Sequence, residues 1–280
     1  MVDEVQLPSD QTATEKAVNA KDKPWIIVFG LSLLFLIGLW LWMTPDGWWE
    51  KLRLFGYAVC HQIEERSFHA HGLGSPLCAR CSGMYLGAVL AIAYQAFQGK
   101  RGRFPKLWVS IILGLFLIWF GFDGINSFLW LFPSLRFGYE PSNLLRLITG
   151  TGVGLGIGSI LAPLFNQSVW HDWVNHSFYE KWFSFPLLLV FAGIMIGGVF
   201  SQSPFILLPA MFLSALSIIF LLSSLWTVVA VMLLGRLNRQ KRWTELALPI
   251  LIGLNICFAQ IILTSWGRHL LTGTWAPLHL

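Results

Sequence analysis

The longest uncharged stretch of the chain runs from Trp182 to Gly235, and it contains no Asp, Glu, Lys or Arg. About 20 mostly apolar residues are enough for one helix to cross the hydrocarbon core of a membrane. The stretch is therefore too long for a single crossing and too apolar for the surface of a water-soluble domain. Only 12% of the 280 residues are charged, against about 25% in soluble domains. This composition excludes a soluble globule, a disordered chain and a coiled coil.

The other apolar stretches have the length of single crossings. The polar turn from Ser201 to Pro204 divides the long stretch into a fifth and a sixth helix. The sequence thus predicts an all-α fold, a polytopic membrane helix bundle of about seven transmembrane helices, in one domain at residues 24–280. The predicted spans, with an outer loop at 45–75, cover residues 24–44, 76–97, 107–128, 142–164, 183–200, 205–234 and 244–266.

Residues 1–23 do not have the features of a cleaved signal peptide. Residues 1–23 mix acidic and basic side chains, and no small-residue cleavage site follows Met43, whereas a signal peptide has a basic first region and such a site. We therefore expect residues 1–23 to form a flexible cytoplasmic tail ahead of an uncleaved first span.

Two loops carry most of the positive charge between predicted spans. Each contains four basic residues: Lys100, Arg101, Arg103 and Lys106 in the first, and Arg236, Arg239, Lys241 and Arg242 in the second. Because cytoplasmic loops are enriched in Lys and Arg, and seven crossings place both loops on the side of the N-terminus, we expect the N-terminus inside and the C-terminus outside the cell membrane. The net charge of +5 then reflects orientation in the lipid bilayer, and nucleic acid is not an expected partner.

Four residues with the chemistry of metal ligands are expected at the outer membrane surface: Cys60, His61, Cys78 and Cys81. Ser75 and Pro76 indicate a helix start, because Ser is a favoured N-cap and Pro a favoured first helical residue. Cys78 and Cys81 then lie three residues apart on one helical face. A helix N-terminus lowers thiol pKa values, so both are expected to form thiolates readily.

Two chemistries fit these residues. Three cysteines and a histidine form a common ligand set for zinc, whereas a C-x-x-C pair with a third thiol suits thiol–disulfide exchange. Because neighbouring side chains diverge on regular backbone, Cys60 and His61 do not easily reach one metal, and His69 or His71 is an alternative fourth ligand. A structural disulfide with a spare thiol is also open, since an outer surface is oxidising. We rank zinc or a similar divalent metal first.

Ionisable residues within membrane spans are costly, usually paired, and often functional. Asp123 and Asn126 lie near the outer end of the third predicted span, and Asn143 and Arg146 near the outer start of the fourth. Asp123 and Arg146 form the expected ion pair, and Arg80 adds a cation at the same level. We therefore predict one polar pocket that contains all five residues.

The fourth predicted span contains a stripe of glycines. Gly150, Gly154 and Gly158 recur every four residues and so share one helical face. Small residues at this spacing let transmembrane helices approach closely. We expect this helix to pack tightly against a neighbour.

The segments around these residues resemble a known family. They contain the strings CHQ at 60–62, ERSF at 65–68, PLCARCSG at 76–83, DGIN at 123–126 and SNLLRLITG at 142–150. These strings resemble signature segments of the prokaryotic family called domain of unknown function 2085. The resemblance covers roughly residues 55–160, and it implies a multi-pass membrane protein without an established activity. It supports the choice of residues and no particular reaction.

The sequence favours an integral membrane protein whose outer-face metal site lies beside a pocket for an anionic or amphipathic small molecule. If the protein is a metalloenzyme, an open coordination position activates water or a substrate oxygen, and Asp123, Arg146 and His61 are the candidate catalytic residues. Four filled protein ligands would instead make the metal structural. A quinone-linked membrane thiol–disulfide oxidoreductase is the second hypothesis. A small-solute transporter is the third, and the lack of an evident internal repeat counts against it.

Overall fold

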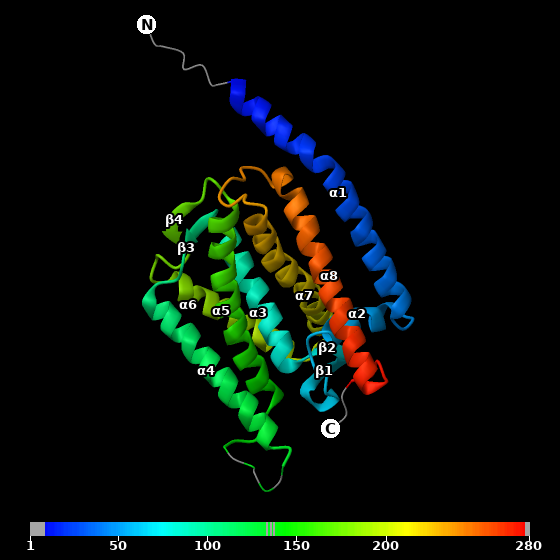
Figure 1. Cartoon of the computed structure of the whole chain (residues 1–280). Helices are drawn as coiled ribbons and strands as arrows, with labels where there is room; N and C mark the ends of the chain where they lie inside the picture. The colour runs from blue at the N-terminus through cyan, green and yellow to red at the C-terminus, as the bar shows by residue number, and fades with distance from the viewer. Residues whose placement is uncertain (1–8, 133, 135, 137, 278–280) are drawn as a thin grey trace.

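The computed structural model describes residues 9–132, 134, 136 and 138–277, with side chains from residue 22 onward. Helices form most of it, and long helices run along the length of the molecule (Figure 1). The helices are α1 (Ser9–Met43), α2 (Trp48–Tyr57), α3 (Ala79–Ala96), α4 (Leu107–Leu129), α5 (Asn143–Val169), α6 (Ser184–Phe200), α7 (Pro204–Leu233) and α8 (Ala247–Thr272), with 3₁₀ turns η1 (Glu64–Arg66) and η3 (Trp243–Leu246).

Each of the seven predicted spans coincides with a helix, which confirms a mostly helical bundle. Five segments of the described chain are long and apolar enough to cross a membrane: Asp22–Met43, Leu107–Leu129, Asn143–Val169, Pro204–Leu233 and Trp243–Thr272. Helix α6 is apolar but has only 17 residues. Helix α3 has 18 residues, among them Arg80 and Gln95. The structure therefore supports a multi-pass protein with at least these five candidate spans.

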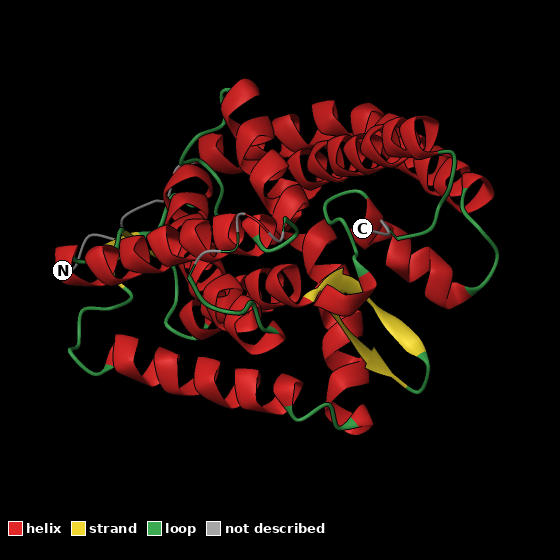
Figure 2. Ribbon diagram, turned by 90° about the horizontal axis from the view of Figure 1, so that it is seen from below, coloured by secondary structure: helices red, strands yellow, loops and turns green. Residues whose placement is uncertain are grey.

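Short strands accompany the predicted helical bundle. Strands β1 (Ser67–Ala70) and β2 (Leu73–Cys78) form an antiparallel hairpin, which Figure 2 shows in yellow. Strands β3 (Arg101–Arg103) and β4 (Val174–Ser177) pair in parallel at the opposite end of the bundle (Figure 1). Both pairings join segments between spans, where hydropathy gives no signal for strands.

Helices α3 and α5 form the tightest contact of the bundle. A Cβ atom on Gly150 would collide with the carbonyl oxygen of Arg80, and one on Gly154 with that of Met84. Gly158 lies equally close to the α3 backbone. The structure thus confirms the close packing predicted from the glycine stripe, and it fixes the first turns of α3 and α5 relative to each other.

One end of the bundle, which we call the basic end, contains residues 97–106, 170–183 and 234–246. These connections bond to one another: the amide of His171 donates to the carbonyl of Gln240 at 2.9 Å. Lys100 forms an ion pair of 2.8 Å with Asp172. Both predicted basic loops therefore lie on the same side of the bundle.

The opposite end, which we call the hairpin end, contains residues 44–78, the end of α4 and the start of α5, and residues 273–277. The Tyr57 hydroxyl donates to the carbonyl of Thr274 at 2.8 Å, and Asn143 Nδ2 donates to the carbonyl of Glu65 at 3.1 Å. These bonds bring distant segments together around the hairpin.

Helix α1 begins earlier than predicted. It starts at Ser9, so residues 9–23 continue the first helix instead of forming a tail, while residues 1–8 lie outside the described residues. Arg236 donates to both carboxylate oxygens of Asp22 at 2.6 and 2.7 Å, and this bonding raises the pKa of Arg236. The pair holds the start of the apolar part of α1 at the basic end.

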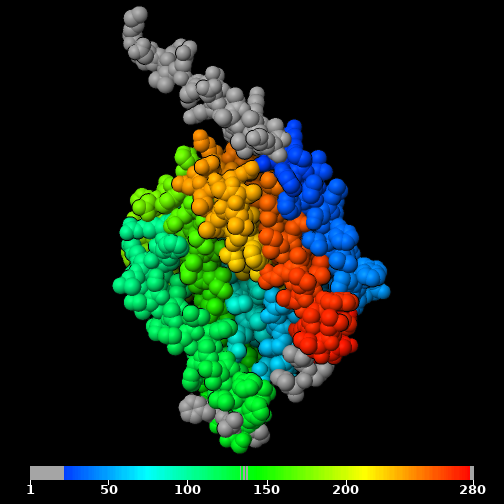
Figure 3. Space-filling model, viewed as in Figure 1, coloured from blue at the N-terminus to red at the C-terminus, as the bar shows by residue number. Residues whose placement is uncertain are grey.

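Beyond this pair, α1 lies along α8 (Figure 3). Asn255 Nδ2 donates to the carbonyl of Phe29 at 2.9 Å. Most apolar side chains of α1 stay exposed, with Leu34 at 66% and Phe35 at 68%. Exposed apolar surface of this extent is what a helix in contact with lipid presents.

Candidate metal centre and polar pocket

The segment that carries Cys60 is held between α2 and the hairpin. Gly56 in α2 has no room for a Cβ, because the carbonyl of Pro76 in β2 lies against it. Gln62 is buried, and its Nε2 donates to the carbonyls of Arg53 and Pro76, both at 2.7 Å. Because Gln62 joins α2 to β2, it explains why a glutamine follows the Cys-His pair.

Cys60, His61 and Cys78 form one group. Their potential ligand atoms all lie within 4.8 Å of one another. Cys60 is 5% exposed and Cys78 is 2% exposed, while His61 is half-buried. The sulfur of Cys60 accepts backbone N–H bonds from Gln62 at 3.4 Å and from Cys78 at 3.3 Å. Such bonds stabilise a sulfur that carries negative charge.

Cys81 extends this group along α3. Its thiol interacts electrostatically with those of Cys60 and Cys78, although it is not among the three residues whose ligand atoms lie within 4.8 Å. Hydrogen bonds with Cys60 and then Cys81 hold the pKa of Cys78 well below its usual range. The bond with Cys78 is the largest cause that raises the pKa of Cys60, to about 12.

The expectation that Cys60 and His61 diverge is wrong. It assumed regular backbone, but the chain here is irregular, and Gln62 adopts a positive φ of 56°. The amide of Ile63 donates to His61 Nδ1 at 3.1 Å and orients the ring. His69 and His71, the alternative ligands, are exposed and do not belong to the group.

The predicted helix start at Ser75 and Pro76 is also wrong. Both residues belong to β2, and the N-cap of α3 is Cys78, with φ −64° and ψ 161°. The reason is that residues 73–78 pair with residues 67–70 across the hairpin. Cys78 thus ends a strand and Cys81 lies in the first turn of a helix, so two different elements supply the two cysteines.

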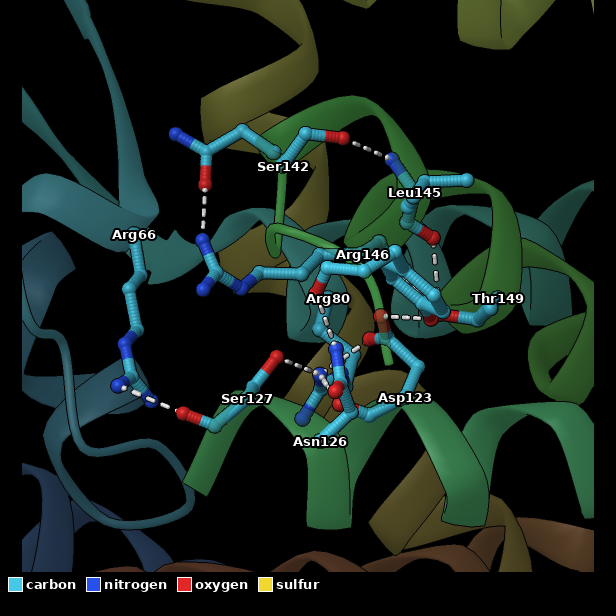
Figure 4. A network of polar contacts seen from close by, with 11 residues as sticks. Arg66, Arg80, Asp123, Asn126, Ser127, Ser142, Leu145, Arg146 and Thr149 are labelled. Carbon is cyan, nitrogen blue, oxygen red and sulfur yellow. Dashed lines mark hydrogen bonds and ion pairs between the residues drawn. The ribbon is translucent and has the colours of Figure 1, made fainter. Parts of the chain in front are cut away.

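The polar pocket adjoins this group through Arg80, which lies between Cys78 and Cys81 in sequence. The Arg80 guanidinium forms an ion pair with the Asp123 carboxylate and donates to Ser127 Oγ at 3.1 Å (Figure 4). Asp123 is fully buried. Its other oxygen accepts a bond of 2.7 Å from the Tyr139 hydroxyl, and the pKa of Tyr139 is raised to about 12 by burial and by this bond.

Arg146 is not the ion-pair partner that the sequence predicted for Asp123. Arg80 takes that place because its long side chain reaches from the first turn of α3 to Asp123 and Ser127 of α4. Arg146 instead donates to Asn143 Oδ1 at 2.9 Å and is 8% exposed. Asn126 Nδ2 donates to the carbonyl of Tyr139 at 2.7 Å. All five predicted pocket residues lie in this region, with different partners than expected.

The pocket carries more positive than negative charge. Arg66 of η1 donates to the carbonyl of Ser127 at 3.2 Å, and burial followed by the charge of Arg80 lowers its pKa. The charges of Arg66 and Arg80 also act on Arg146. The region therefore contains three guanidinium groups and the buried carboxylate of Asp123: Arg80 pairs with this carboxylate, while Arg66 and Arg146 bond to Ser127 and Asn143 (Figure 4).

Sequence reasoning missed three members of this region: Arg66, Ser127 and Tyr139. Arg66 belongs to the ERSF string, which was the available signal, but it lies outside the predicted spans. Ser127 is a common residue in apolar helices, and nothing in the sequence marked Tyr139. Arg268 of α8, which the sequence indicated as a residue bordering the pocket, donates to the carbonyls of Cys60 and His61 and so ties the cysteine segment to α8.

Comparison with known proteins gives the family. The family model described as predicted membrane protein (DUF2085) matches residues 60–160. An uncharacterized protein of Methanocaldococcus jannaschii is 30% identical over 162 residues, which are 53% of this chain and 96% of that relative. The chain belongs to the DUF2085 family. The family assignment and the apolar helices together make it a membrane protein.

A second relative agrees with this assignment. An uncharacterized protein of Methanothermobacter thermautotrophicus is 31% identical over 113 residues, 40% of this chain and 92% of that relative. No solved structure matches the chain. The region matched by the DUF2085 model begins at Cys60 and ends within α5, so it contains both the cysteine group and the polar pocket.

Proposed function

We propose that this DUF2085 protein holds a zinc-like metal ion with Cys60, His61, Cys78 and Cys81. The observation that carries the proposal is the approach of the first three ligand atoms to within 4.8 Å of one another. Tetrahedral zinc bonds sulfur at about 2.3 Å and nitrogen at about 2.0–2.1 Å. Its ligand atoms thus lie about 4 Å apart, so small shifts of these side chains complete the site.

The metal in this proposal organises the pocket. Cys60 and Cys78 are buried, and four protein ligands fill a tetrahedral site, as is usual for structural zinc. The ion links the segment before the hairpin to the first turn of α3. That turn contains Arg80, and the hairpin begins directly after Arg66, so the metal fixes the spacing of the two guanidinium groups.

The pocket binds an anionic or amphipathic small molecule. Three arginines against one carboxylate leave an excess of positive charge, and buried charges without counter-charges are costly, so an anion is the component that balances the pocket. The planar guanidinium of one arginine can bond two oxygens of the same carboxylate or phosphate group at once. The Nε atoms of Arg80 and Arg146 are buried without a hydrogen-bond partner among the described residues. In this arrangement Asp123 positions Arg80, while Arg66 and Arg146 contact the ligand.

The proposed topology places both sites outside the cytoplasm. Seven crossings, including the shorter α3 and α6, carry the chain from an inner N-terminus to an outer C-terminus. All of the basic loops then lie inside, as is usual for membrane proteins. Alkaline phosphatase fusions in a bacterial host test this: we expect activity for a fusion after Tyr139 and none for a fusion after Arg239. The reverse pattern contradicts the topology.

Elemental analysis of the purified protein tests the metal. We expect about one zinc or similar ion per wild-type chain and a loss of that ion in Cys78→Ser. Cys257→Ser is the matched control, because Cys257 is a buried cysteine of α8 outside the group. A wild-type protein without stoichiometric metal contradicts the proposal.

A thiol–disulfide oxidoreductase is the second candidate, because the sulfur atoms of Cys60 and Cys78 lie within 4.8 Å of each other and both cysteines, like Cys81, are free. Alkylation with and without a reductant separates the two functions. Equal labelling in both conditions supports metal binding, whereas labelling that rises after reduction supports disulfide exchange. The apolar cavity that the structure shows lies at the other end of the bundle, away from these thiols.

Titration with inorganic phosphate tests the pocket. We expect Arg146→Ala to weaken binding by roughly tenfold or more, since a hydrogen bond to a charged group contributes about 1.5–3 kcal/mol. Metal content should stay unchanged. Arg101→Ala at the basic end is the control and should bind phosphate as the wild type does. Loss of both metal and phosphate binding in Arg146→Ala would show instead that the two sites form one structural unit.

A further inference from the structure

The basic end contains a cavity of about 460 Å³ that takes no part in the metal centre. Its volume lies in the range of small-molecule sites. Its walls come from α3, α5, α7, η3, α8 and the residues after α3 and α5, and they are mostly apolar: Ile92, Leu161, Phe165, Phe178, Phe220 and Trp243. Along α7 the lining extends from Phe220 to Thr227, about 10 Å of helix. The cavity therefore has room for a stretch of hydrocarbon chain.

The hydroxyl groups in the cavity wall already donate hydrogen bonds within the protein, so they do not require a polar ligand. Ser224 donates to the carbonyl of Phe220 at 2.7 Å, and Thr227 donates to that of Ser223 at 2.7 Å. Both donors are thus used within α7. Asn166 also lines the cavity, and its Nδ2 donates to the carbonyl of Arg101 at 2.8 Å. Among the described residues that line the cavity, Lys100 carries the charge.

Lys100 lies at the edge of the cavity among exposed groups. Its Nζ lies 4.0 Å from the ring centroid of Trp170 and 2.8 Å from the Asp172 carboxylate. The Asp172 side chain is 59% exposed, and exposed ion pairs contribute only about 0–1 kcal/mol. A phosphate group can therefore replace Asp172 as the partner of Lys100 at little cost.

The cavity also opens on the side of the bundle that faces lipid. Phe220 and Trp243 both line it, yet they are 45% and 65% exposed. Exposed Phe on a membrane-spanning helix faces lipid, and Trp is typical of the level of the headgroups. Trp243 packs against Trp170 with ring centroids 4.7 Å apart. The opening thus lies beside lipid at the headgroup level of the basic end.

We propose that this cavity binds an acyl chain of an anionic phospholipid, with the lipid phosphate at Lys100. The apolar walls accept the chain, and Lys100, with Lys241 and Arg242 next to Trp243, supplies the positive charge. Basic pockets between transmembrane helices on the cytoplasmic side bind anionic headgroups in this way. The proposal is independent of the metal centre.

Native mass spectrometry of the full-length protein in detergent tests the charge requirement. Phosphatidylglycerol and phosphatidylcholine with identical dioleoyl chains are the two probes. We expect tighter binding of phosphatidylglycerol, and about fivefold weaker binding of it to Lys100→Gln, the factor for about 1 kcal/mol per basic residue near a membrane surface. Arg103→Gln is the matched control, because Arg103 is an exposed cation of the same loop that does not line the cavity.

A second variant tests the cavity itself. Ala162 lines the cavity from α5, and Ala162→Phe should lower binding of both lipids by filling it. Undiminished phosphatidylglycerol binding to folded Ala162→Phe overturns the proposal, as does equal binding to Lys100→Gln and Arg103→Gln. The proposal is also overturned, in favour of a free fatty acid as the ligand, if two results occur together. These are displacement of both lipids by oleate and binding of phosphatidylglycerol that is no tighter than that of phosphatidylcholine. If Ala162→Phe does not fold, the Lys100 comparison still decides.

Discussion

The two ends of the bundle use charge in different ways. At the hairpin end, charged side chains are buried and bond to each other, as Arg80 does with Asp123. At the basic end, most charged side chains are exposed, as is Lys106, which bonds to the carbonyl of Glu180. Asp22, which is buried in its pair with Arg236, is the exception that the described residues show there. Burial of charge is costly, so the hairpin end is where we expect a functional site. The exposed basic residues of the basic end are instead the basis for the proposed orientation of the protein in the membrane.

The largest expected effect comes from breaking the buried pair. Asp123→Asn leaves the Arg80 guanidinium without its counter-charge in a buried site, which costs about 3–5 kcal/mol in the free energy of unfolding. Asp172→Asn breaks an exposed pair at the basic end and should cost at most about 1 kcal/mol. Equilibrium unfolding in mixed micelles measures both. Equal effects of the two substitutions would contradict the contrast between the ends.

The glycine contact between α3 and α5 is the next test. Gly154→Ala forces a Cβ against the Met84 carbonyl, and overpacking of this kind costs about 1–3 kcal/mol. Gly156→Ala is the control on the same helix, because its nearest neighbour is Leu113 Cβ at 4.0 Å. It should stabilise slightly, since Ala favours a helix over Gly by up to about 1 kcal/mol. If Gly154→Ala lowered the free energy of unfolding less than Gly156→Ala does, the result would contradict the packing of α3 and α5.

The smallest effect concerns a single hydrogen bond. Tyr139→Phe removes the bond to Asp123 but keeps the ion pair with Arg80, so a loss of about 0.5–1.5 kcal/mol in the free energy of unfolding is expected. Lys106→Met at the basic end removes an exposed bond to a carbonyl and should change stability by less than about 0.5 kcal/mol. Identical thermal midpoints for Tyr139→Phe and the wild type would show that the Tyr139 bond does not support the pocket.

The helices were predictable because their signal is local. About 20 apolar residues in a row are enough to identify a span, and the seven predicted spans agree with α1 and α3–α8 to within a few residues, apart from the early start of α1 at Ser9 and the extension of α5 and α8. The hairpin was not predictable in this way, since residues 67–78 are not periodic and β3 pairs with a strand more than sixty residues away.

The composition of the candidate site was predictable, but its pairing was not. The sequence places Arg80, Asp123 and Arg146 at one level of the membrane. Which arginine faces Asp123 depends on the rotation of α3 and α5 about their axes, and the glycine contacts between them set that rotation. The joint approach of Cys60 and His61 depends on the positive φ of Gln62, which no residue pattern indicated.

X-ray absorption at the zinc edge tests the central claim most directly, on the purified full-length protein with Cys257→Ser as a parallel sample. The account predicts a shell dominated by sulfur at about 2.3 Å with one nitrogen at about 2.0–2.1 Å, identical in both samples. A protein that contains no stoichiometric metal, or a shell of oxygen and nitrogen without sulfur, would contradict it.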